Sequence, residues 1–166
     1  VLPALAISNF ITAAEAVSAH QHWFPSRAAE YGPHMQQVLL MGSALSAADY
    51  LACQRVRTEI VRRTSALFLD NDLVATPTVA ITAPAVGAEK TTVGGTPMGV
   101  VPAMRHYTRW SSLSGCPSVS VPCGRAPGGL PIGLQLMGRM DGDAAVLRAA
   151  RAYEEVRGPF PVVDPG

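Results

Sequence analysis

The segments that decide the fold are Ser118-Val119-Ser120-Val121-Pro122 and, a short distance further on, Pro131-Ile132-Gly133-Leu134-Gln135-Leu136-Met137. The first alternates polar and apolar residues, as a half-buried strand does, and the second is mostly apolar. Between them lies Gly124-Arg125-Ala126-Pro127-Gly128-Gly129, which is rich in turn-forming residues. Two strands joined by such a loop predict a β-hairpin, although a six-residue loop leaves the pairing open.

The rest of the chain divides according to its helix-breaking residues. Residues 1–72 hold 3 of the 14 prolines and 2 of the 15 glycines, so residues 73–166 hold the other 11 prolines and 13 glycines. This imbalance predicts helices in the first part and strands and turns in the second. The order expected is helices, a strand, a long loop, a helix, two strands and a final helix, which is an α/β chain.

Overall composition excludes several classes of protein. The chain of 166 residues is 48% hydrophobic and 15% charged, which excludes a disordered chain. Thirteen basic and 12 acidic residues give a net charge of +1, so no basic field for nucleic acid is expected. No segment reaches the roughly 18 consecutive apolar residues of a membrane span, so no membrane partner is expected either.

Helices are predicted at four places in addition to one between the strands. They cover residues 4–24, ended by Pro25; residues 33–41, stopped by Gly42; residues 46–69; and residues 144–156, capped by Asp143. In the third helix Ser46 is the expected N-cap and Asp49 adds an acidic group to the first turn. Its apolar stripe has one gap at Thr64 and is predicted to face a core; the stripe consists of Leu45, Ala48, Ala52, Val56, Ile60 and Leu67.

The region between this helix and the hairpin contains fewer regular elements. Residues 73–76 are a short apolar strand stopped by Pro77, and residues 77–102 are expected to be mostly loop. Residues 104–114 predict a helix that ends at Gly115.

Metal and cofactor chemistry finds little support in the residue pattern. His20 and His22 are two apart, so on a helix they point to different faces and make a poor metal site. No glycine-rich phosphate loop is present. We therefore expect neither a metal nor a cofactor.

Nucleophilic chemistry is equally incomplete. The nucleophile-elbow pattern Gly-x-Ser-x-Gly is absent. A Cys–His hydrolase is an open alternative, in which Cys116 or Cys123 would pair with His106. The chain has three cysteines, an odd number without a Cys-x-x-Cys pair, and this favours reduced thiols and the cytoplasm.

Four segments in order nevertheless resemble the C-terminal part of the amidase signature family. They are Asp49-Tyr50-Leu51-Ala52-Cys53-Gln54-Arg55-Val56-Arg57, Phe68-Leu69-Asp70-Asn71-Asp72-Leu73-Val74-Ala75-Thr76-Pro77-Thr78 with Ala83-Pro84 after it, Leu113-Ser114-Gly115-Cys116-Pro117-Ser118-Val119-Ser120-Val121-Pro122-Cys123-Gly124, and Gly129-Leu130-Pro131-Ile132-Gly133-Leu134-Gln135-Leu136-Met137-Gly138. The last is similar to a Gly-Leu-Pro-x-Gly-x-Gln strand of that family. Together these segments span about residues 46–156.

The resemblance implies a mixed β-sheet flanked by helices and an amide hydrolase or amidotransferase. Members use a serine nucleophile, a second serine in a cis peptide and a lysine, and these lie in the N-terminal and middle regions. Lys90, the only lysine here, lies downstream of the position of the family's lysine. Ser111 and Ser112 lie in a late segment, where Ser112 replaces the usual Asn. No catalytic residue is therefore expected in this chain.

The domain hypothesis follows from that comparison of motifs. Residues 1–166 are interpreted as the C-terminal portion of a single amidase domain, without its N-terminal and catalytic-core portion. Such a piece, with the remainder of its sheet missing, is expected to be poorly soluble alone. The alternative is a non-catalytic binding or assembly module derived from the same fold. Association with a second copy of the chain remains open.

The resemblance also implies which residues line the substrate pocket. The segment before the Leu-Ser/Thr-Gly motif lines the acyl pocket in the family, and here it contains Arg105, His106, Thr108, Arg109, Trp110 and Ser112. Arg105 and Arg109 are four apart and share a helix face, either to bind a carboxylate or as a solvated pair. Members acting on glutamine carry basic residues where this chain has Gln37 and Val38. A small-molecule amide is therefore the expected substrate.

Overall fold

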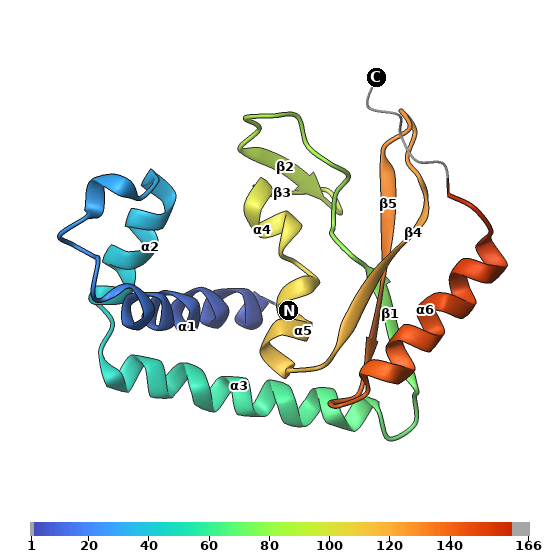
Figure 1. The fold of residues 1–166 in the computed structure, drawn as a ribbon, viewed down its shortest axis with the longest axis horizontal. Coiled ribbons are helices and arrows are strands. Elements are labelled where there is room, and N and C mark those ends of the chain that lie inside the picture. The colour runs from blue at the N-terminus through green and yellow to red at the C-terminus, as the bar shows by residue number, and fades with distance from the viewer. Residues whose placement is uncertain (1, 161–166) are drawn as a thin grey trace. The chain divides into compact units, whose positions relative to one another are not determined.

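The computed structural model describes residues 2–160 and divides the chain into two compact units (Figure 1). The unit Val1–Arg62 is helical, and the unit Arg63–Gly166 contains all the described strands. Helix α3, Ala47–Leu67, begins in the first unit and ends in the second. The predicted α/β class and the predicted change from helices to strands along the chain are confirmed.

The first unit is built on the packing of α1, Leu2–His20, against α2, Pro33–Ser43. Gly42 lies inside α2 at this contact, because a Cβ there would be 2.2 Å from the carbonyl oxygen of Ala13. The prediction that Gly42 stops the helix is therefore wrong. Its glycine serves the close approach of two helices, and the helix continues past it.

Helix α1 is shorter than predicted at its C-terminal end. It ends at His20, whereas the sequence predicted a helix as far as Phe24. The backbone N–H groups of Trp23 and Phe24 both donate to the carbonyl oxygen of His20 at 2.9 Å, and a series of turns follows. A 3-10 turn, η1, Ala28–Glu30, leads into α2. The residue before a proline avoids helical geometry, so Pro25 acts further upstream than expected.

Helix α3 begins with the predicted cap. The Ser46 backbone N–H donates to Asp49 Oδ2 at 3.0 Å, and the Asp49 N–H donates to Ser46 Oγ at 3.2 Å. This reciprocal pair satisfies two backbone N–H groups at the start of the helix, in the manner of a capping box. Ser46 as the N-cap is therefore confirmed.

The apolar stripe of α3 does not face a core within the described residues. Val56 is 40% exposed and Leu67 is 41% exposed, and Ala48 and Ala52 are exposed as well. The buried residue of α3 is Thr64, at 2% exposure, which is the gap in the predicted stripe. The hydroxyl of Thr64 accepts a hydrogen bond, described below, and this contact explains why a polar residue is buried.

The second unit is organised around a three-stranded antiparallel sheet in the order β1-β5-β4. Its strands are β1, Leu73–Pro77, β4, Ser118–Arg125, and β5, Pro131–Gly138. Strands β4 and β5 form the predicted hairpin, with Ser118 opposite Met137 and a register shift between Pro122 and Gly124. Pro122 lacks an N–H donor, which a strand at the edge of a sheet tolerates.

Helix α6, Asp143–Arg157, packs on one face of this sheet. Its Ala150 joins Val121 of β4 and Leu136 of β5 in a buried cluster. The N-cap of α6 is Gly142, and Asp143 is the first helical residue without a capping hydrogen bond from its side chain. The prediction that Asp143 caps the helix is wrong by one position, although its negative charge still lies in the first turn, where the helix dipole favours it.

The expected loop over residues 77–102 contains a second, two-stranded hairpin. Strands β2, Lys90–Val93, and β3, Thr96–Gly99, pair antiparallel around Gly94 and Gly95. These glycines have φ of 55° and 82°, and a two-residue turn of this hairpin type requires positive φ at both positions.

The helix predicted over residues 104–114 is two short helices in the structure. They are α4, Val100–Met104, and α5, Thr108–Ser114. Helix α5 ends at Gly115, whose φ is 72°, so the predicted helix stop at this glycine is confirmed.

Candidate functional site

The six residues predicted to contact substrate lie between the end of α4 and the end of α5. Arg105 is the C-cap of α4, and Thr108, Arg109, Trp110 and Ser112 belong to α5. The Arg109 N–H donates to the Arg105 carbonyl oxygen at 3.2 Å. This bond spans four residues, so the two arginines lie one helical turn apart on the same side of the segment.

Trp110 anchors α5 to the end of α3. Its Nε1–H donates to the Thr64 hydroxyl at 2.7 Å, across 46 residues of chain. Because this N–H is already engaged, the indole ring is the part of Trp110 that remains for contact with a substrate. Ser112 donates its hydroxyl proton to the Thr108 carbonyl oxygen at 3.0 Å and is exposed.

Arg105 and Arg109 form a like-charged pair without an acidic partner among the described residues. Both side chains are partly buried. Burial lowers the pKa of Arg109, and the positive charge of Arg105 lowers that pKa further. Two like charges one turn apart on a helix destabilise it by about 0.2–0.5 kcal/mol. The structure therefore places two cations together at a site where helix stability alone would disfavour them.

His106 lies between the two arginines in sequence and is also incompletely paired. Its Nδ1 is shielded from solvent and has no hydrogen-bond partner within the described part of the chain. The ring of His106 packs edge-on against Tyr107, with 4.9 Å between the ring centroids. A shielded nitrogen without a partner is uncommon in folded proteins, because its desolvation is uncompensated.

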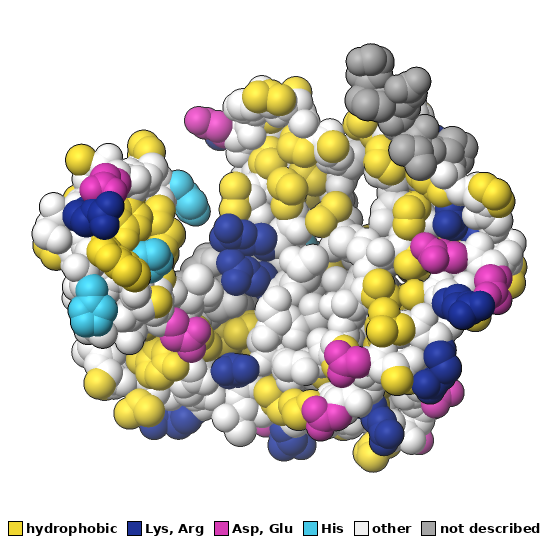
Figure 2. Space-filling view, in the orientation of Figure 1, with side chains coloured by type: hydrophobic (Ala, Val, Ile, Leu, Met, Phe, Trp, Pro, Cys, Tyr) yellow, Lys and Arg dark blue, Asp and Glu magenta, His cyan; other side chains and the backbone are white. Residues whose placement is uncertain are grey.

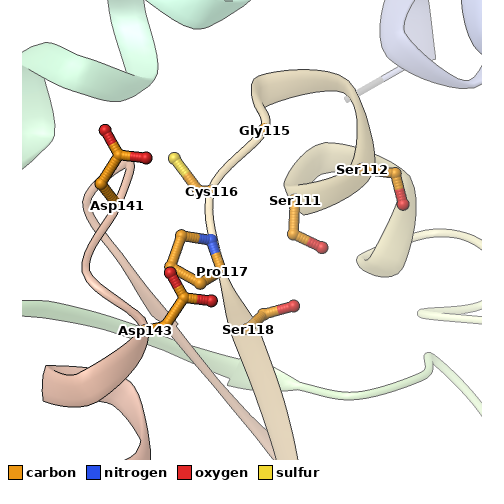
Figure 3. Close-up of a pocket in the computed structure, with 8 residues that line it drawn as sticks. All are labelled: Ser111, Ser112, Gly115, Cys116, Pro117, Ser118, Asp141 and Asp143. Carbon is orange, nitrogen blue, oxygen red and sulfur yellow. The ribbon is translucent and has the colours of Figure 1, made fainter.

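A cavity of about 360 Å³ lies beside the C-terminal end of α5 (Figure 3). Of the six predicted residues, it contains Ser112. The other residues that line it are Ser111, Gly115, Cys116, Pro117, Ser118, Asp141 and Asp143. Figure 3 shows the Cys116 thiol and the Asp141 carboxylate on the same side of the segment that leaves α5.

The groups in this cavity do not make an activated nucleophile. No histidine or lysine lines it, and Ser111 donates its hydroxyl proton to the Thr108 carbonyl oxygen at 3.0 Å. Carboxylates near a thiol disfavour the thiolate, which is the reactive form. Cys116 is 8% exposed and lies in this setting without His106.

The second cysteine of the Cys–His alternative is exposed. The Cys123 thiol donates to the Ile132 carbonyl oxygen at 3.5 Å, at the register shift of the hairpin. Together with the setting of Cys116, this leaves the Cys–His alternative without structural support.

A row of polar side chains crosses the sheet on the face opposite α6. Thr76, Gln135 and Ser120 are paired in register on β1, β5 and β4, so their side chains share a face. Gln135 is 4% exposed, and its Nε2–H lies 3.4 Å from Thr76 Oγ1 as a donor. The sequence analysis missed this row, although the polar positions alternating along the strands were the signal for it.

Gly133 leaves room for two hydroxyls of this face to lie close together. The Thr78 and Ser120 hydroxyl oxygens are 2.5 Å apart in a hydrogen bond. A Cβ at Gly133 would lie 2.6 Å from Thr78 Oγ1 and 2.8 Å from Ser120 Oγ. Any larger residue at Gly133 would therefore displace these two hydroxyls.

Two searches of the molecule for other kinds of site had a simple outcome. Across the described residues, no three His, Cys, Asp or Glu side chains are grouped so as to hold a metal ion. Within the same part of the chain, no helix has the length and apolar character needed to cross a membrane. The predicted pair His20 and His22 is separated in role, because His20 Nδ1 is hydrogen-bonded to the Tyr31 hydroxyl at 2.9 Å.

Comparison with known proteins identifies the family. The model of the family described as Amidase matches residues 2–147, so the chain belongs to the amidase family, and the predicted resemblance is confirmed. It is 34% identical over 135 residues to a fatty acid amide hydrolase of Oryza sativa subsp. indica, covering 81% of this chain and 22% of the relative. It is also 36% identical over 143 residues to a glutamyl-tRNA(Gln) amidotransferase protein of Brevibacillus brevis, covering 80% of this chain and 27% of the relative.

Solved structures agree with this assignment. A crystal structure of an amidase superposes with a TM-score of 0.87 at 24% identity, covering 94% of this chain and 36% of that one, which shows the shared fold. A protein described in a study of a vestigial complex and the origins of an s-triazine catabolic enzyme superposes with a TM-score of 0.84 at 32% identity, covering 92% of this chain and 34% of that one. The chain thus spans between about a fifth and about a third of these relatives.

Proposed function

We propose that residues 1–166 are the C-terminal portion of an amidase domain that hydrolyses a small-molecule amide to a carboxylic acid and ammonia or an amine. One observation carries this proposal. The family model matches residues 2–147 of this chain, yet the chain spans 22% of the rice fatty acid amide hydrolase. A family match that fills the chain and covers so little of the relative is what a portion of the domain would produce.

The surface of the described residues supports this interpretation. Leu51 of α3 is 55% exposed and Leu69, just after α3, is 82% exposed, next to the exposed stripe residues of the same helix. In the second unit Val101 and Met104 are exposed, and Figure 2 shows hydrophobic side chains gathered over α4 and the β2–β3 hairpin. Exposed apolar surface of this kind is usually covered by another part of the protein.

The edges of the three-stranded sheet support the same proposal. Strands β1 and β4 lie at the two ends of the order β1-β5-β4, and each pairs on one side only among the described strands. Unpaired strand edges favour association with another strand or aggregation. In our proposal the remainder of the domain extends this sheet, and the isolated chain is poorly soluble.

The chemistry in this proposal is divided between two portions of one domain. The portion outside this chain supplies a serine nucleophile, a second serine in a cis peptide and a lysine. The lysine accepts a proton through the second serine while the nucleophile attacks the amide carbonyl, and backbone N–H groups stabilise the oxyanion. The amine leaves with a proton, and water then hydrolyses the acyl-enzyme to free the acid.

The role of the present chain is to provide scaffold and one wall of the substrate pocket. The wall is the segment from Arg105 to Ser112, held in place by the bond between Trp110 and Thr64. Ser111 and Ser112 donate their hydroxyl protons to the Thr108 carbonyl oxygen, which suits a structural role rather than that of a nucleophile.

Substrate and location extend the same proposal. A small-molecule amide fits better than a tRNA-bound substrate, because Gln37 and Val38 stand where members acting on glutamine carry basic residues. Three free cysteines support a reducing compartment, the cytoplasm.

An activity assay tests the proposal directly. Purified residues 1–166 are expected to give no amide hydrolysis above background, whereas the full-length protein hydrolyses a small amide. The matched control carries Cys→Ala changes at Cys53, Cys116 and Cys123 and excludes thiol chemistry. Turnover by residues 1–166 that survives these changes would overturn the proposal. A folded full-length protein without amide hydrolysis would favour the non-catalytic module.

A further inference from the structure

Arginines elsewhere in the chain are matched with nearby carboxylates. Arg62 contacts Glu59 at 2.8 Å, and Arg151 contacts Glu155 at 2.8 Å, each within one helical turn and each exposed. Arg27 likewise pairs with Glu30. This is the usual way for a protein to place arginines on a helix, since opposite charges one turn apart stabilise it.

The segment that joins α4 to α5 departs from this arrangement. Arg105 and Arg109 are one turn apart, joined by a 3.2 Å backbone hydrogen bond, and partly buried. Within the described residues neither has an acidic partner, and the charge of Arg105 acts directly on Arg109. His106, between them in sequence, keeps a solvent-shielded Nδ1 without a hydrogen-bond partner.

We propose that Arg105 and Arg109 form a carboxylate-binding subsite, so that the amide hydrolysed by this protein carries a second, anionic carboxylate group. This inference rests on the proposed function. A guanidinium presents a planar set of N–H donors that matches a carboxylate with two parallel hydrogen bonds. The second guanidinium, one turn away, adds charge from the same side. A bound carboxylate would thus neutralise the repulsion between the two arginines.

The position of the pair on the fold suits specificity. The Trp110 indole N–H bond to Thr64 fixes α5 against the end of α3, so the Arg109 backbone is held by a tertiary contact rather than by a loop. A binding group on an anchored helix discriminates better than one on a mobile segment, because less ordering is needed on binding. In this proposal the arginines recognise the substrate and take no part in bond cleavage.

The test compares two substrates that differ only in charge. The full-length protein is assayed with the monoamide of glutaric acid and with the methyl ester of that monoamide. We expect kcat/KM for the acid to exceed that for the ester, and Arg109→Gln and Arg105→Gln to lower the acid value by roughly 10–100-fold while changing the ester value little. Arg109→Lys keeps the charge and is expected to retain part of the preference. Arg151→Gln, a matched change at an exposed arginine, is expected to leave both values unchanged.

Direct binding separates this inference from the proposed function. Glutarate is titrated into the full-length protein by calorimetry, with no turnover required. Binding that is lost in Arg105→Gln and Arg109→Gln but kept in Arg151→Gln would support the subsite even if no amide were hydrolysed. Equal kcat/KM for acid and ester, an equal loss for both substrates in the Gln variants, or glutarate binding that survives those variants would overturn it.

Discussion

The hydrogen bond from Trp110 Nε1 to Thr64 Oγ1 connects two elements 46 residues apart, and replacing Thr64 with Val tests its role. Thr64 is 2% exposed, so the indole N–H would lose its acceptor in a place that water reaches poorly. Leaving a buried donor without a partner costs about 1–3 kcal/mol. The added methyl group recovers part of that cost, which leaves a net destabilisation of about 1–2 kcal/mol.

The expected result is local, so it is measured by hydrogen–deuterium exchange. A loss of about 1–2 kcal/mol corresponds to roughly 5–30-fold faster exchange of the amides that open with α5. Peptides from α6, which packs on the sheet through Ala150, serve as the internal control and are expected to be unchanged.

A double-mutant cycle shows whether the hydrogen bond is the cause. In a Trp110→Phe background the indole N–H is already absent, so Thr64→Val is expected to have little further effect on α5 exchange. The same acceleration by Thr64→Val in both backgrounds would refute the reasoning, because the effect would then come from packing around Thr64 alone.

Two further predictions concern the helical unit. Gly42→Ala places a methyl group 2.2 Å from the Ala13 carbonyl oxygen, and the overpacking cost of about 1–3 kcal/mol exceeds the gain of about 1 kcal/mol in helix propensity, so the thermal midpoint should fall. Gly32→Ala, where nothing lies within 4 Å of the new Cβ, is the control, and a midpoint raised by Gly42→Ala would contradict the packing. Hydrogen bonds from the Ser46 hydroxyl and backbone N–H lower the pKa of Asp49, so its contribution to the first turn of α3 is present at neutral pH and is lost as pH falls through the lowered pKa. Exchange in that turn should accelerate with acidification in the native protein and not in Asp49→Asn; an identical pH profile in the two would count against the cap.

The parts of the fold that local sequence patterns encode were predictable. Alternation over residues 118–122 and the apolar run over 131–137 predicted the hairpin of β4 and β5. Ser46 and Asp49 predicted a cap that the structure contains in full. In each case the deciding interaction joins residues that are close in sequence, or follows from the two-residue periodicity of a strand.

The errors arose where a residue serves a distant partner. Gly42 looked like a helix stop, but the reason for its glycine is the Ala13 backbone in another helix. Thr64 looked like a gap in an apolar stripe, but it is buried against Trp110. The exposed stripe of α3 is the same kind of error, since periodicity identifies an apolar face but not what covers it.

One error was avoidable from the sequence. Two adjacent glycines, Gly94 and Gly95, between short segments rich in Thr and Val are a signal for a hairpin with positive φ at both turn positions, and the structure has that turn. Treating the whole region as loop gave the prolines on either side too much weight.

The candidate site was predictable in its location and less so in its contacts. The family motif led to residues Arg105 to Ser112, and the spacing of Arg105 and Arg109 indicated a shared face, which the backbone bond between them supports. That Trp110 donates its N–H to Thr64 depends on the placement of the end of α3 beside α5, and no local pattern encodes that placement. Contact of these residues with a substrate stays a prediction.

The location of the reactive serine tests the central claim most directly. The full-length protein is treated with a fluorophosphonate, which modifies activated serine hydroxyls covalently, and the modified peptide is identified by mass spectrometry. We predict a single modified serine outside residues 1–166, together with loss of amide hydrolysis. Modification of Ser111, Ser112 or Ser114 that abolishes the activity would contradict the account.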